Sequence, residues 1–185
     1  MNNNFNGKGG AATRMGRLLL IALVALAAAG IASAQDNTDL KFNGGIGVIP
    51  VTGVSANGTV NLNVVRGVAP GAPWKIAALN AEVSFDGRIK VNGSGLLLAS
   101  GNGIGTNAGQ SVHATLFCGP SATATAHNST LAGVALDANG NFRIDDFLSP
   151  LPPNVCDSPV LLIRNVGGVW FAAGIRKLVA DSAIK

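Results

Sequence analysis

AEVSFDGRIKV, residues 81–91, consists of two strand-like pieces on either side of Asp86-Gly87. An Asp-Gly pair between such pieces is a strong signal for a two-residue β-hairpin turn, because both residues tolerate the positive φ angles that the turn requires. The stretch therefore predicts two antiparallel strands. The same kind of turn signal occurs twice more in the chain, at Asn139-Gly140 and at Gly167-Gly168.

Apolar and polar residues alternate through much of the chain after residue 45. In TVNLNVV (59–65), Val60, Leu62 and Val64 fall on one side of an extended chain, which is typical of a half-buried strand. Parallel α/β folds need a helix-sized crossover between strands, and helical spacing is nearly absent here. We therefore expect an all-β fold, a single antiparallel β-sandwich or alternatively a small β-barrel. Strands are expected at 46–52, 58–68, 74–85, 88–99, 111–118, 131–137, 141–147, 159–165 and 168–174.

The first 34 residues have the order of a secretory signal peptide. Arg14 and Arg17 precede an unbroken apolar run of 14 residues at 18–31, and Ala-Ser-Ala follows at 32–34 as a signal peptidase site. The run is shorter than the about 20 apolar residues of a membrane-spanning helix. We expect a signal-peptide helix that is cleaved between Ala34 and Gln35, with no stable membrane insertion afterwards.

Cleavage at this point would leave a chain of low net charge. The whole sequence has 13 Lys and Arg and 9 Asp and Glu, and three of the cations precede residue 35, so the remainder carries 10 − 9 = +1. Its cations are scattered, which disfavours nucleic-acid binding because this needs a clustered basic face. The expected parts are a signal peptide (1–34), a short leader (35–45), a β-sandwich domain (46–174) and a tail or short helix (175–185).

The two cysteines, Cys118 and Cys156, are 38 residues apart. In the oxidising compartment that an exported chain enters, an even pair of cysteines normally forms a disulfide, and we expect that bond here. His113 lies five residues before Cys118, so on a regular strand the two side chains point to opposite faces and do not form a nucleophile–base pair. His113 and His127 are expected at the surface.

Asp137, Asn139 and Asn141 place oxygen-bearing side chains at alternate positions, as a calcium loop does. The glycine and the glutamate that such a loop needs are replaced by Phe142 and Leu148. A hairpin turn explains the pattern more simply, and we expect no metal and no cofactor.

Residues suited to acid–base catalysis are few: one glutamate (Glu82), two histidines and no tyrosine. Asp145 and Asp146 are neighbours on a predicted strand, so their carboxylates should point apart. A hydrolase would need a site assembled from distant residues such as His113 and Asp145. We expect no catalytic residue and keep that site as an alternative.

VWFAAG (169–174) is apolar on both faces of an extended chain, which predicts a strand buried on both sides. Alternatively, one face contacts a partner or another copy, since exposed apolar patches often mark contact sites. Trp74 and Trp170 are the only tryptophans, few for a sugar-binding module with aromatic platforms.

From residue 65 onward, the order of features resembles a family of small secreted bacterial proteins. The family carries an R-G-x-x-P-G-x-P-W segment, here Arg66–Trp74, then two cysteines and a closing G-G-x-W-F-A strand, here Gly167–Ala172. The likeness extends over residues 65–174 and implies export and one compact domain, without an activity. This chain departs from the family in its charge-poor, Ala- and Asn-rich faces and in its basic tail after Gly174.

These observations favour an exported, non-enzymatic β-protein, secreted or periplasmic, that contacts a protein or cell-surface partner at the cell envelope or outside the cell. A first alternative is a carbohydrate- or calcium-dependent binding module that uses Asp137, Asn139, Asn141 and an exposed tryptophan. The second alternative is the hydrolase with His113 and Asp145.

Overall fold

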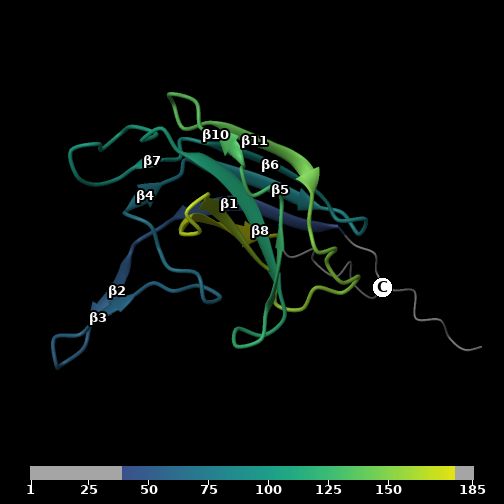
Figure 1. Ribbon diagram of the computed structural model, residues 1–185, viewed down its shortest axis with the longest axis horizontal. Coiled ribbons are helices and arrows are strands. Elements are labelled where there is room, and N and C mark those ends of the chain that lie inside the picture. Colours follow the sequence, from purple (N-terminus) through teal and green to yellow (C-terminus); the bar gives the residue numbers. More distant parts are fainter. Residues whose placement is uncertain (1–38, 178–185) are drawn as a thin grey trace, which may run out of the picture. The chain divides into compact units, whose positions relative to one another are not determined.

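The computed structural model describes residues 39–177. The predicted signal peptide, its cleavage site at Ala34 and Gln35, and most of the predicted tail lie outside these residues. The described part is all-β, as expected (Figure 1). Its strands are β1 (Leu40–Gly47), β2 (Val51–Val54), β3 (Val60–Leu62), β4 (Trp74–Lys75), β5 (Ala78–Val83), β6 (Arg88–Ser94), β7 (Leu97–Leu98), β8 (Ser111–Cys118), β9 (Thr125–Asn128), β10 (Val134–Ala135), β11 (Phe142–Phe147), β12 (Val160–Asn165) and β13 (Trp170–Arg176).

Nine of these strands form one antiparallel sheet. Its order is β10-β8-β12-β13-β1-β5-β6-β11, and β9 pairs with β8 beside this path. The ends of the sheet meet where Asn128, the last residue of β9, exchanges two backbone hydrogen bonds of 2.9 and 2.8 Å with Ser149, just beyond β11. The expected antiparallel β fold is thus confirmed, with a sheet that curls into a nearly closed barrel.

Two of the three predicted turns join paired strands. Gly87 has a φ of +83° and connects β5 to β6, where Asp86 accepts a hydrogen bond from the backbone N–H of Arg88 at 2.9 Å. Gly168 has a φ of +88° between β12 and β13. The predicted hairpin around Gly140 is wrong in its pairing: the turn forms, but β10 pairs with β8 and β11 pairs with β6.

Several predicted strand limits are also wrong. The predicted strand at 74–85 divides into β4 and β5, and that at 88–99 divides into β6 and β7 around Gly95, which has a φ of +66°. The predicted leader at 35–45 contains the start of β1, because Leu40 and Phe42 pair with Val83 and Ala81 of β5. β9 was not predicted, since its four residues lack apolar alternation.

The core lies inside the curled sheet, where every second side chain points. Leu79, Ala81 and Val83 of β5 pair with Gly93, Val91 and Ile89 of β6, and the five apolar side chains are buried. Phe142 of β11 pairs with Gly93, so its ring fills the space above the glycine. Close packing of this kind leaves little room for added atoms.

Replacing Gly93 by alanine is expected to lower the free energy of unfolding by about 1–3 kcal/mol, because the added Cβ would overlap the ring of Phe142. Urea unfolding would measure the loss. Gly53→Ala is the matched control, since a Cβ at Gly53 meets no atom within 4 Å. Equal stability of the two variants would contradict this packing.

The segment at 66–74 runs beside the first residue of β13, where Pro70 forms a parallel bridge with Trp170. Gly71 and Ala69 form backbone hydrogen bonds with Trp170 at 2.9 and 3.1 Å, and the ring of Trp74 stacks on Phe171 with centroids 4.2 Å apart. Trp74, Trp170 and Phe171 are all at least 96% buried. The strand at 169–174 is therefore buried on both faces, and neither tryptophan is the exposed platform that the carbohydrate alternative required.

Candidate functional site

The outward face of β1, β5, β6 and β11 carries two cross-strand rows of polar side chains. One row runs through Asn43, Asn80, Asn92 and Arg143, which are paired from strand to strand. Because successive strand residues alternate between the two faces, these side chains point away from the core. A regular polar surface results.

The second row consists of Lys41, Glu82, Lys90 and Asp145, paired across the same four strands. Lys41 and Glu82 form an ion pair of 3.3 Å between half-exposed side chains. Lys90 forms no ion pair with any group of residues 39–177. Exposed ion pairs contribute little to stability, so the pair of Lys41 and Glu82 adds little to the stability of the fold.

Between the two rows lies a shallow groove with a volume of about 300 Å³. It is lined by three lysines, three asparagines, Glu82 and two residues whose side chains belong to the core. With three cations and one anion among the lining side chains, the groove has a formal charge of 3 − 1 = +2. The lining residues are Lys41, Phe42, Asn43, Asn80, Ala81, Glu82, Lys90, Asn92 and Lys177.

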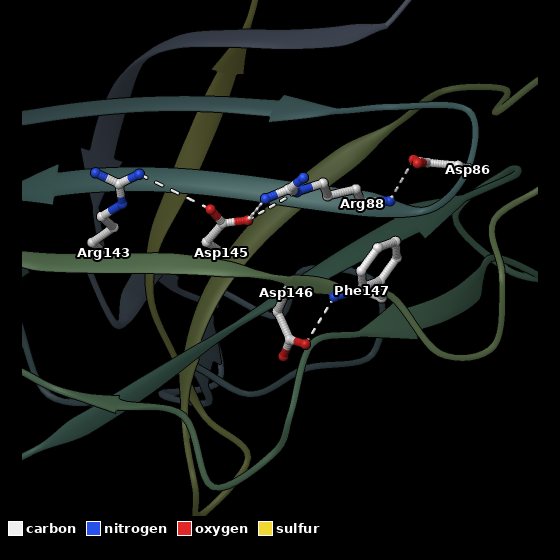
Figure 2. A network of polar contacts seen from close by, with 6 residues as sticks. All are labelled: Asp86, Arg88, Arg143, Asp145, Asp146 and Phe147. Carbon is white, nitrogen blue, oxygen red and sulfur yellow. Dashed lines mark hydrogen bonds and ion pairs between the residues drawn. The ribbon is translucent and has the colours of Figure 1, made fainter.

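Arginines hold Asp145 at the border of this face. The Nε and Nη2 groups of Arg88 donate hydrogen bonds to Asp145 Oδ1 at 3.0 and 2.9 Å, and Arg143 lies 4.0 Å from its other oxygen. Figure 2 shows Asp145 between these two guanidinium groups, with Asp146 on the other side of β11. The expectation that the two carboxylates point apart is confirmed.

Asp146 contributes to the loop before β10 instead. Its carboxylate accepts hydrogen bonds from the backbone N–H groups of Thr130 at 2.7 Å and Phe147 at 2.8 Å. The bond from Thr130 is the main reason that the pKa of Asp146 lies below its usual value. Asp146 is therefore a structural acceptor in its ionised form.

The structure does not bring His113 and Asp145 together. Asp145 lines a pocket of about 200 Å³ with residues of the loop at 129–134, and His113 is not part of its lining. His113 is 98% buried, and neither ring nitrogen has a hydrogen-bond partner in the described chain. Burial and, to a smaller extent, the charge of Arg164 lower the pKa of His113 to about 4. The expected surface position of His113 is wrong.

His127 is also buried rather than exposed. Its Nδ1 lies 2.7 Å from the carbonyl oxygen of Pro150. Because a carbonyl only accepts, Nδ1 must carry the proton of this hydrogen bond. His127 thereby links β9 to the segment that follows β11, which is a structural role.

The residues of the predicted calcium alternative form a turn. Asp137 Oδ1 accepts hydrogen bonds from the backbone N–H groups of Asn139 and Asn141, both at 2.8 Å, and Oδ2 accepts one from the amide of Asn141 at 2.9 Å. The hydrogen bonds from Asn141 lower the pKa of Asp137 most. Within residues 39–177, no three His, Cys, Asp or Glu side chains gather as metal ligands would.

Cys118 and Cys156 form a disulfide, as expected, with their Cα atoms 4.9 Å apart. The bond joins the end of β8 to the proline-rich segment between β11 and β12. It is compatible with an oxidising, exported location.

Comparisons with protein-family models, with curated proteins and with solved structures found no match. In the described part of the chain, no helix has the length and apolar character needed to cross a membrane.

Sequence reasoning did not identify the groove. Polar residues alternate in LNAE (79–82) and KVN (90–92), which was a usable sign of a polar sheet face. The alignment of Asn43 with Asn80 and Asn92, however, depends on the register between strands, which the sequence alone does not specify.

Proposed function

We propose that this chain is an exported, non-enzymatic binding protein that contacts acidic polysaccharide on a cell surface. The observation that carries the proposal is the groove on the outward face of β1, β5 and β6, where three lysines lie beside three asparagines. Lysine ammonium groups bind carboxylate, sulfate or phosphate groups, and asparagine amides both donate to and accept from sugar hydroxyls. The two side-chain types together fit a ligand with both kinds of group.

The lining of the groove supports binding rather than catalysis. It contains no Ser, Thr, Cys or His, and its one carboxylate, Glu82, is paired with Lys41. Apart from lysine, the side chains that usually serve as nucleophile or general base are therefore absent from the lining or already paired. Export is supported by the signal-peptide pattern and is compatible with the disulfide.

Charge reversal at Lys90 is expected to weaken binding of an acidic oligosaccharide at least about tenfold, because an unpaired cation of the groove becomes an anion. Calorimetric titration with an acidic and a neutral oligosaccharide of equal length would measure this, and the acidic one should bind more weakly as salt is raised. Lys75→Glu is the matched control, since Lys75 is exposed on β4 and does not line the groove.

Three results would refute the proposal. They are no binding of either oligosaccharide, equal losses for Lys90→Glu and Lys75→Glu, and equal affinity for the acidic and neutral ligands. Asn80→Ala provides a second probe, because it removes an amide without changing charge and should reduce binding at all salt concentrations.

A further inference from the structure

The hairpin of β2 and β3 stands apart from the curled sheet (Figure 1). Its two strands pair only with each other, and all seven of their residues are exposed. A two-stranded hairpin alone is marginally stable in water and usually gains stability from a third strand or from packing. Within the described residues, no other strand provides either.

A β-bulge gives this hairpin one apolar face. Val51 pairs with Leu62 and Val54 pairs with Val60, with a register shift between Val51 and Gly53. Without the shift, residues 51 and 54 would point to opposite faces, because they are an odd number apart. With it, four apolar side chains share one face.

The opposite face of the hairpin is polar and internally bonded. The amide of Asn61 donates to Ser55 Oγ at 3.0 Å, and Thr52 Oγ1 donates to the backbone oxygen of Asn61 at 3.1 Å. The hairpin is therefore amphipathic, although neither face is covered.

The base of the hairpin is anchored to the rest of the domain. The indole N–H of Trp170 donates a hydrogen bond to the backbone oxygen of Asn63 at 3.0 Å. The side-chain amide of Asn63 donates one to the backbone oxygen of Ile49, also at 3.0 Å. The chain contains no Lys, Arg, Asp or Glu from residue 42 to residue 65. Proteins commonly protect exposed strand edges with such charges, and none is present here.

From these features we propose that the apolar face of the β2–β3 hairpin docks against the same face of a second copy. An uncharged apolar patch is complementary to itself, as a two-fold symmetric interface requires. The side chains of Ile49, Val51, Val54, Val60, Leu62 and Val64 are 40–69% exposed. Complete burial of all six, the four on the hairpin face and the flanking Ile49 and Val64, would remove about 1,200 Å² in total from two copies at about 100 Å² each. This area meets the lower limit of a standard interface.

This dimer is independent of the proposed polysaccharide binding, because the hairpin shares no residue with the groove. Sedimentation of the purified protein should give twice the monomer mass at about 100 µM and should show dissociation on dilution. Val60→Asp, which places a charge in the apolar face, should yield monomers at every concentration. Asn61→Asp is the matched control: it adds the same charge on the polar face of the same strand and should remain dimeric.

Urea unfolding of both variants would show that the barrel is intact, since both positions are exposed. If Val60→Asp unfolds more easily than the wild type, Leu62→Thr, which keeps a strand-forming residue, replaces it as the test. The proposal would be overturned by any of three results. The wild type stays monomeric, the apolar-face variant still dimerises, or Asn61→Asp is monomeric as well. A monomer would also leave the hairpin to a different partner.

Discussion

Replacing Cys118 and Cys156 together by alanine is expected to lower the free energy of unfolding by about 4 kcal/mol. The disulfide closes a loop of 38 residues, and loop-closure entropy for that length gives about 4 kcal/mol at 25 °C. A domain of this size is typically stable by only about 5–15 kcal/mol. The bond therefore accounts for a large share of the stability of the fold.

The location of the bond explains why other contacts would not replace it. Cys118 ends β8, and the next residue, Gly119, donates a backbone hydrogen bond to Asp157 at 2.7 Å. The segment at 148–159 has no regular strand and connects β11 to β12. Without the disulfide, this segment would depend on a few hydrogen bonds to stay against β8.

Urea unfolding of the double variant would measure the loss, with the wild type in the presence of a reductant as the control. The two should agree, because both remove the same covalent bond. A loss below about 1 kcal/mol would contradict the entropic account of this loop. If the double variant lost much stability and the reduced wild type did not, the loss would come from the space left by the two missing sulfur atoms instead.

The second large effect is a loss of stability in weak acid. His113 is expected to lower the free energy of unfolding by about 3 kcal/mol as the pH falls from 6.5 to 4, because the folded pKa of about 4 lies below the ordinary value of 6.5. Between these values the unfolded chain binds a proton that the folded chain does not. Stability therefore rises with pH through this window and levels off, for this group, about one pH unit above 6.5.

The cause of the low pKa is the position of the imidazole ring. His113 is 2% exposed and pairs across the sheet with Arg164 of β12. A protonated ring would have to stay charged in the protein interior, beside a guanidinium and without a hydrogen-bond partner in the described chain. Both effects favour the neutral form.

His113→Leu isolates this contribution. The variant should lose most of the pH dependence between 4 and 6.5, while His127 is kept in both proteins. At pH 7 it should be more stable than the wild type by about 1–2 kcal/mol, because two buried nitrogens without partners are removed. Urea midpoints measured from pH 4 to pH 7 would test both statements, and equal slopes for the two proteins would refute the assignment to His113.

Two aspartates affect the stability of the protein at pH values below this window. The hydrogen bonds to Asp137 and Asp146 lower the pKa of both groups below the ordinary value of 3.8. Their stabilising contributions are present above that value and are lost as the pH falls through the folded pKa. A further decline below pH 4 in the His113→Leu protein would therefore be expected.

Local signals in the sequence predicted the all-β class, two of the three hairpins and the disulfide. The turns at Gly87 and Gly168 depend on a backbone conformation that glycine adopts at little cost, so neighbouring residues are sufficient to indicate them. The chain has two cysteines, so each could pair within the chain only with the other. Alternation also indicated correctly that Asp145 and Asp146 point apart.

Tertiary structure alone decided which strands pair over long distances and which polar residues become buried. Alternation placed His113 on a polar face of its strand, yet packing of other parts of the chain covers that face. The two polar rows beside the groove run across β1, β5, β6 and β11, whose order in the sheet depends on pairing between segments far apart in the chain. Strand propensity and turn chemistry act between near neighbours, whereas register and burial depend on contacts between residues far apart in the chain.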